Sequence, residues 1–262
     1  MTLSFNKIIL SIAITGAVLL TFVTVCRSEI VVFDDVTTIQ TPIRIKVLTK
    51  AGFFARGGRL VDIYLDAIHL KKILTGGDGY GYLKYTPRVE GFKSIEARSD
   101  AESASGLHLV TSKSDKAIII DIEGAFKDAV FSEEIRENSR EAVNSLSKAY
   151  KIIYISRFVG KGVGRSWLEK ENYPKSVILR WQGADTIKLF KKRGVLLDAV
   201  IGSATVISAA KKHIPHRYTF EKSKDGKMVK DWDEIINLLQ PIPPAEEQQD
   251  RLPVKENGVV PP

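Results

Sequence analysis

The stretch KAIIIDIEGAF, residues 116–126, is the part of the sequence from which the fold is predicted. Its apolar run, residues 117–120, has the length and the β-branched content of a strand buried on both faces, as in parallel sheets. Asp121 would then lie at the carboxyl end of that strand, where open α/β sheets place their ligand crevice. Asp121 and Glu123, followed by Gly124, suit a nucleophile with a nearby proton donor or metal ligand. They equally suit a buried strand that ends in ordinary turn acids.

Downstream of this stretch, predicted strands and helices alternate. Strands are expected at residues 117–120, 152–155, 177–179, 199–201 and 218–220, and helices at 132–148, 166–172, 186–193, 205–212 and 232–239. Regular alternation of this kind indicates a parallel sheet with helices on both faces. We therefore predict an α/β, Rossmann-like three-layer domain with a parallel sheet over residues 113–240.

Upstream, between residues 42 and 112, the hydrophobic period changes to two. The run IRIKV at residues 43–47 alternates apolar and basic side chains, as half-buried strands do, and glycine-rich breaks separate several such runs. The stretches at residues 74–81, 85–87 and 91–97 resemble bacterial immunoglobulin-like and carboxypeptidase-regulatory-like sandwich modules. We therefore predict an all-β immunoglobulin-like sandwich over residues 29–112.

The two ends of the chain differ from the rest in composition. Residues 8–25 carry no charge, which predicts a membrane-directed segment within residues 1–28. An uncleaved anchor, a cleaved signal and a lipoprotein signal at Cys26 remain alternatives. The few flanking charges favour a membrane-anchored protein whose domains are extracytoplasmic, in the periplasm or at the cell surface. Residues 241–262 are rich in proline and polar residues, which predicts a disordered tail.

The composition favours an anionic partner. The chain has 262 residues, 44% of them hydrophobic, and a formal net charge of +8. Its single cysteine excludes an internal disulfide framework. No Walker loop, nucleophile elbow or basic stripe with interleaved aromatics is present, so no nucleic-acid partner is expected. Basic residues concentrated between Lys188 and Arg217 suit either a solvated helix surface or a surface for anionic headgroups.

Two motifs carry a resemblance to a known family. Residues 121–125, DIEGA, resemble the D-x-D-G-[TS] motif of haloacid dehalogenase-like (HAD) phosphatases, and Ser156 follows the second strand as a serine or threonine does there. Residues 152–183 look like the LNS2 branch of that superfamily, which is found in lipins, with Trp167-Leu168 and Asn172-Tyr173-Pro174 at matching places. The resemblance extends from Lys116 to Leu239 and implies a HAD-like fold for this part of the chain.

The resemblance also implies a set of roles for individual residues. Asp121 would be the nucleophile that forms an aspartyl-phosphate, and Glu123 the general acid and base. Phosphate would be bound by Ser156, Arg157 and Lys188, with Lys191 or Lys192 as alternatives to Lys188. Mg²⁺ would be bound by Asp121, Glu123 and Ser203.

The sequence also departs from the family pattern. Glu123 stands where the family has aspartate, and residues 202–208, GSATVIS, contain no acid where the family has the aspartates that help to hold Mg²⁺. We therefore predict a membrane-tethered, HAD-like protein with a degenerate phosphatase domain, which binds a phosphorylated small molecule or an anionic lipid headgroup. The alternatives are an active Mg²⁺-dependent phosphomonoester phosphatase and a non-catalytic structural or interaction protein of the cell envelope.

Overall fold

The computed structural model describes residues 28–100, 102–127 and 134–239. The predicted membrane-directed segment at residues 8–25 and the predicted tail at residues 241–262 lie outside these ranges. Among the helices within them, none combines the length and the apolar character needed to cross a membrane. Within these ranges the protein is rich in β-structure, with 42% strand and 23% helix.

The first half of the described chain is a β-sandwich, as the alternating hydrophobic pattern predicts. Its strands are β1 Ser28–Val32, β2 Asp35–Thr38, β3 Ile43–Ala51, β4 Phe54–Ala55, β5 Leu60–Leu65, β6 Ile68–Leu74, β7 Tyr80–Tyr85, β8 Gly91–Ser99 and β9 Glu102–Thr111. One sheet has the order β1-β3-β4, with β7 also paired to β3, and the other has the order β2-β9-β8-β5-β6. Alternate residues such as Ile45 and Val47 of β3 face Ile63 of β5 and Ile95 of β8 in the shared core, because successive strand side chains point to opposite faces.

The second half is built around a six-stranded sheet with the order β12-β11-β10-β13-β14-β15, in which all pairs are parallel. Its elements are β10 Lys116–Asp121, α2 Ile122–Ala125, α3 Ser139–Leu146, β11 Lys151–Ser156, α4 Lys161–Lys170, β12 Ile178–Arg180, α5 Ala184–Lys192, β13 Leu196–Ile201, α6 Ala204–Ala210, β14 His216–Thr219, β15 Lys227–Met228 and α7 Trp232–Leu239. Ile118 and Ile120 of β10 pack on one face with α3 and α7, whereas Ile119 packs on the other face with α5 and α6. The predicted burial of this strand on both faces is confirmed.

The predicted fold class, a Rossmann-like and HAD-like three-layer domain, is wrong for this chain. Strand outweighs helix, and the helices are short, from four residues in α2 to ten in α4. The core on the α5 and α6 face also contains Val36 of β2 and Leu107 and Leu109 of β9. Part of that face is therefore covered by the sandwich rather than by helices. Alternation along the sequence predicted the parallel strands but could not show that another sheet completes their core.

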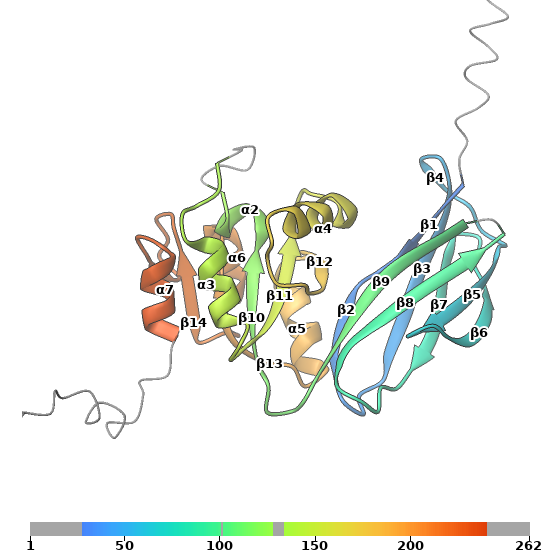
Figure 1. Ribbon diagram of the computed structural model, residues 1–262, viewed down its shortest axis with the longest axis horizontal. Coiled ribbons are helices and arrows are strands. Elements are labelled where there is room, and N and C mark those ends of the chain that lie inside the picture. The colour runs from blue at the N-terminus through green and yellow to red at the C-terminus, as the bar shows by residue number, and fades with distance from the viewer. Residues whose placement is uncertain (1–27, 101, 128–133, 240–262) are drawn as a thin grey trace, which may run out of the picture.

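The two halves lie side by side (Figure 1), and Asp34, in the link between β1 and β2, holds them together. Its carboxylate accepts hydrogen bonds from the backbone N–H of Leu107 in β9, at 3.0 Å, and from that of Ile178 in β12, at 2.9 Å. Lys161 Nζ lies 3.3 Å from the same carboxylate, and Arg165 of α4 also pairs with it. Because buried charges are stable only when they are paired and hydrogen-bonded, these four donors hold the sandwich in a fixed position against β12 and α4.

Candidate functional site

Asp121 lies at the carboxyl end of β10 and its side chain is fully buried. One carboxylate oxygen, Oδ2, accepts hydrogen bonds from the backbone N–H of Ser203 at 3.1 Å and from its hydroxyl at 2.8 Å. Arg157 Nε lies 3.5 Å from the same oxygen. The carboxyl ends of β10, β11 and β13 thus converge on one carboxylate, as the parallel sheet predicts.

The pKa of Asp121 is raised from 3.8 to about 6, chiefly because burial disfavours the charged form. Arg157 and the two hydrogen bonds from Ser203 oppose this effect but do not overcome it. The other carboxylate oxygen, Oδ1, is buried and has no hydrogen-bond partner among the described residues. Asp121 therefore changes its protonation state only one or two pH units below neutrality.

Glu123, in α2, is held by four hydrogen-bond donors. Its Oε1 accepts from the Ser156 hydroxyl at 2.5 Å, from Phe158 N at 3.1 Å and from Val159 N at 3.0 Å, and its Oε2 accepts from Arg157 N at 3.1 Å. Burial opposes ionisation of Glu123, but these hydrogen bonds outweigh it, so the pKa lies below its usual range. Successive backbone N–H groups of this kind form a nest that binds anions. In this protein the anion in the nest is the carboxylate of Glu123.

Two glycines leave no space beside Asp121. A Cβ atom added at Gly202 would lie 2.5 Å from Asp121 Cβ, and one added at Gly124 would lie 2.4 Å from Ser203 N. Glycine is needed at both positions for this close approach. Asp121 is 0% exposed and Glu123 is 3% exposed, so neither carboxylate faces a cavity that could hold a substrate. A nucleophile needs an open line of approach to the atom that it attacks, and Asp121 has none.

The oxygen donors at this site do not fit a magnesium ion. Mg²⁺ requires near-octahedral coordination by charged or polar oxygens. The carboxylate of Glu123 is fully engaged by N–H and O–H donors, the Ser203 hydroxyl is engaged with Asp121, and the guanidinium of Arg157 lies where a cation would be repelled. Across residues 28–100, 102–127 and 134–239, no group of three or more His, Cys, Asp or Glu side chains could hold a metal ion.

The structure brings together most of the residues that the sequence singled out. Asp121, Glu123, Ser156, Arg157 and Ser203 form one hydrogen-bonded cluster. Lys188 lies apart from them, on the exposed side of α5, where Nζ donates to Asp185 at 3.0 Å. The backbone N–H groups of residues 157–159 were missed, because the conformation of a loop is not visible in its residue types.

A cleft of about 550 Å³ lies between the sandwich and the carboxyl ends of β11 and β12. It is lined by Val31, Val32, Phe33, Asp34, Leu48, Lys50 and Tyr80 of the sandwich and by Ser156, Arg157, Phe158, Val159, Gly160, Lys161, Ile178, Leu179 and Arg180 of the second half. Four of these side chains are cationic and one, that of Asp34, is a carboxylate. The cleft therefore combines positive charge with aromatic walls, and sequence reasoning missed it because its lining residues are far apart along the chain.

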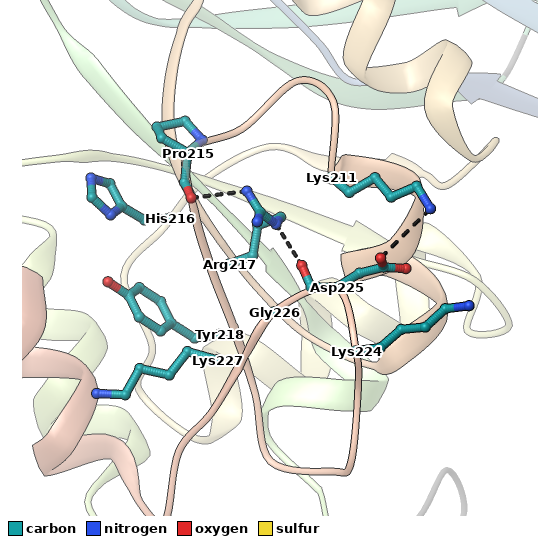
Figure 2. A pocket seen from close by; sticks show the side chains of 9 residues that line it. All are labelled: Lys211, Pro215, His216, Arg217, Tyr218, Lys224, Asp225, Gly226 and Lys227. Atoms are coloured by element: carbon teal, nitrogen blue, oxygen red, sulfur yellow. Dashed lines mark hydrogen bonds and ion pairs between the residues drawn. The ribbon is translucent and has the colours of Figure 1, made fainter.

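A second hollow, of about 470 Å³, contains part of the basic concentration noted in the sequence (Figure 2). It lies at the edge of the sheet formed by β14 and β15, and its basic lining includes Lys211, Arg217 and Lys227. Arg217 Nε donates to the backbone carbonyl of Asp225 at 2.7 Å, and Lys211 Nζ lies 3.6 Å from the carboxylate of the same residue. These cations stabilise the loop that leads into β15. A structural role of this kind accounts for part of the basic concentration without any ligand.

Neither a protein-family profile nor a characterised protein matches the sequence. The chain is similar to the CARDB domain of a Pyrococcus furiosus protein in complex with di-metal ions, with 20% identity over 32% of this chain and 85% of that chain at a TM-score of 0.25. It is also similar to fibronectin(III)-like modules of Clostridium thermocellum, with 15% identity over 32% of this chain and 98% of that chain at a TM-score of 0.24. A carbohydrate acetylesterase from Xanthomonas citri matches with 8% identity over 78% of this chain and 71% of that chain at a TM-score of 0.36. The comparisons give no support for the HAD superfamily or its LNS2 branch. The part of the chain that the structure describes is rich in β-structure and joins a two-sheet β-sandwich to a parallel sheet.

Proposed function

We propose that this chain is a non-catalytic binding protein that takes a phosphorylated or otherwise anionic ligand in the cleft between the sandwich and the parallel sheet. The observation that carries this proposal is the closed pair of acids. The carboxylate of Glu123 occupies the nest of N–H groups at residues 157–159, and Asp121 is buried behind it. A phosphoryl group could reach neither acid without displacing the chain's own side chains, which argues against hydrolysis.

The ligand class follows from the cations of the cleft. Arg157 and Arg180 come from the carboxyl ends of β11 and β12, and Lys50 comes from β3 of the sandwich. Arginine presents a planar set of donors that matches the oxygens of a phosphate or carboxylate. Phe33 and Phe158 add apolar surface that would contact the non-ionic part of the ligand. A small phosphate monoester and an anionic lipid headgroup share this chemistry.

The proposal places the protein at a cell envelope. It rests there on the uncharged segment at residues 8–25, which would anchor the chain in a membrane and leave the two halves outside the cytoplasm. A membrane anchor would keep the cleft close to lipid headgroups, where basic side chains are attracted to anionic lipids.

The binding part of the proposal is tested by calorimetric titration of the full chain with glycerol 3-phosphate. Losing one arginine contact to a charged ligand costs about 1.5–3 kcal/mol, so Arg180→Ala should weaken binding roughly ten- to hundredfold. Lys188→Ala is the matched control, because Lys188 is exposed on α5 and does not line the cleft. Equal affinity of the two variants would overturn the proposal. Binding to phosphatidic acid vesicles but not to glycerol 3-phosphate would identify a lipid as the source of the phosphate.

The non-catalytic part is tested with para-nitrophenyl phosphate and Mg²⁺. We expect no phosphate release by the wild type and no change in Asp121→Asn. Release that depends on Mg²⁺ and disappears in that variant would overturn this part and favour the active phosphatase.

A further inference from the structure

The hairpin between β3 and β4 exposes two aromatic side chains at its tip. Phe53 is 100% exposed and Phe54 is 79% exposed, whereas large apolar side chains of a folded domain are usually buried. Ala51 pairs with Phe54 across the hairpin, and Gly52 supplies the positive φ of +59° that the tight turn requires. The hairpin therefore holds both rings in water on a well-defined turn.

This tip, between β3 and β4, lies at the end of the sandwich where the chain enters β1 (Figure 1). Ser28, the first residue of β1, pairs antiparallel with Ala51, the last residue of β3. Because the two strands are antiparallel, the start of β1 lies beside the end of β3, next to the turn at the tip. The uncharged segment at residues 8–25 ends only three positions before Ser28. Three residues of chain reach at most about 10 Å, which is the longest link that the sequence allows between residue 25 and Ser28.

Apolar and basic side chains lie near the tip, together with an ion pair between Lys50 Nζ and Glu29 at 3.5 Å. Leu60 and Leu74, which pair at the same end of the sandwich, are both exposed. Arg56, the residue after β4, is exposed as well. Aromatic and aliphatic side chains flanked by cations are typical of surfaces that contact the interface of a bilayer, where rings enter the headgroup region and cations meet lipid phosphates.

We propose that the hairpin at residues 51–54 inserts Phe53 and Phe54 into the interface of the bilayer that residues 8–25 enter. The inference rests on the membrane part of the proposed function and is independent of the ligand in the cleft. Phe53 lies in the two-residue turn, beyond the Ala51–Phe54 pair, and so forms the outermost part of the hairpin. The two rings would enter the headgroup region, which is roughly 5–8 Å deep on each side, and fix the sandwich on the membrane surface, so that the chain has two points of attachment.

The test uses the full chain in vesicles of phosphatidylcholine and phosphatidylglycerol. Cys26→Ser removes the native thiol, and Phe53→Cys provides a single site for a fluorescent label. Val89→Cys in the same background is the matched control, because Val89 is also apolar, is 63% exposed and lies in the loop after β7 at the opposite end of the sandwich. Lipids with brominated acyl chains should reduce the fluorescence of the label at position 53 and leave that at position 89 unchanged.

Three outcomes would overturn the inference. If the protein co-sediments with vesicles but the label at position 53 is not quenched, the anchor holds and the hairpin does not insert. If the protein does not co-sediment at all, the membrane attachment itself fails, while the calorimetric test of the cleft is unaffected. If the wild-type protein is instead a dimer in detergent solution and Phe53→Ser is a monomer, the tip is a contact between two copies of the chain.

Discussion

The buried carboxylate of Asp121 should make the stability of this protein depend on pH in a defined window. Its pKa is about 6 in the folded protein and 3.8 in the absence of the fold. A raised pKa means that the folded state binds the proton more tightly than the unfolded state. The stabilising contribution of protonated Asp121 is therefore fully present below pH 3.8 and is lost as the pH rises through about 6. At about 1.4 kcal/mol for each pH unit, the loss amounts to about 3 kcal/mol.

Asp121→Asn isolates this contribution. The amide oxygen of asparagine can still accept both hydrogen bonds from Ser203, and the side chain no longer titrates. Urea unfolding of both proteins between pH 4 and pH 7 gives the free energy of unfolding at each pH. The wild-type value minus the variant value should fall by about 2.5 kcal/mol across this range, which begins just above the unfolded pKa. Parallel pH profiles would refute the reasoning.

Ser203→Ala provides a check on the direction of the effect. The Ser203 hydroxyl stabilises the ionised form of Asp121, so its removal should raise the pKa further. The window in which stability is lost should then shift to higher pH. A shift to lower pH would show that the hydroxyl does not act on this carboxylate.

Three further substitutions test the packing around the site by chemical denaturation. Glu123→Gln places an amide N–H₂ against backbone N–H donors and should lower the free energy of unfolding by about 3 kcal/mol; an unchanged value would show that the nest does not need an anion. Asp34→Asn leaves Lys161 and Arg165 without their buried counter-ion, so a loss of about 3 kcal/mol or more is expected, together with weaker ligand binding in the cleft. Gly202→Ala should lower the free energy of unfolding by about 1–3 kcal/mol, because the added Cβ would clash with Asp121; an unchanged free energy would contradict the close approach of the two residues.

The sequence predicted the local elements better than their assembly. Alternating residues predicted the sandwich, and the apolar run before Asp121 predicted a strand buried on both faces; both are confirmed. The failure lay in the fold class. A pattern of strands and helices shows which faces are apolar, but not which element covers them. Val36 and Leu109 of the sandwich are part of the core beneath the parallel sheet, and nothing in their own stretches of sequence pairs them with the helices α5 and α6 of that core.

The candidate site shows a similar division. Residue types and their spacing were sufficient to place Asp121, Glu123 and Ser156 at one edge of the sheet, because the carboxyl ends of parallel strands meet there. The partners of each acid could not be predicted. Glu123 is held mainly by the backbone N–H groups of residues 157–159, which every residue except proline carries, so their convergence depends on φ and ψ angles rather than on side chains.

Two acids whose pKa values are moved in opposite directions are often an acid and base pair in an enzyme, and Asp121 and Glu123 have this electrostatic signature. The same signature arises whenever one carboxylate is desolvated and its neighbour is saturated with donors, whether or not a substrate can reach them. Access distinguishes the two cases, and here both carboxylates are enclosed. Their hydrogen bonds instead tie α2 to the loop after β11 and to the turn before α6. That loop carries Arg157 and Phe158 into the cleft. The acids therefore fix one wall of the cleft from behind, and under the proposed function a variant that disturbs them should alter ligand binding through the position of Arg157.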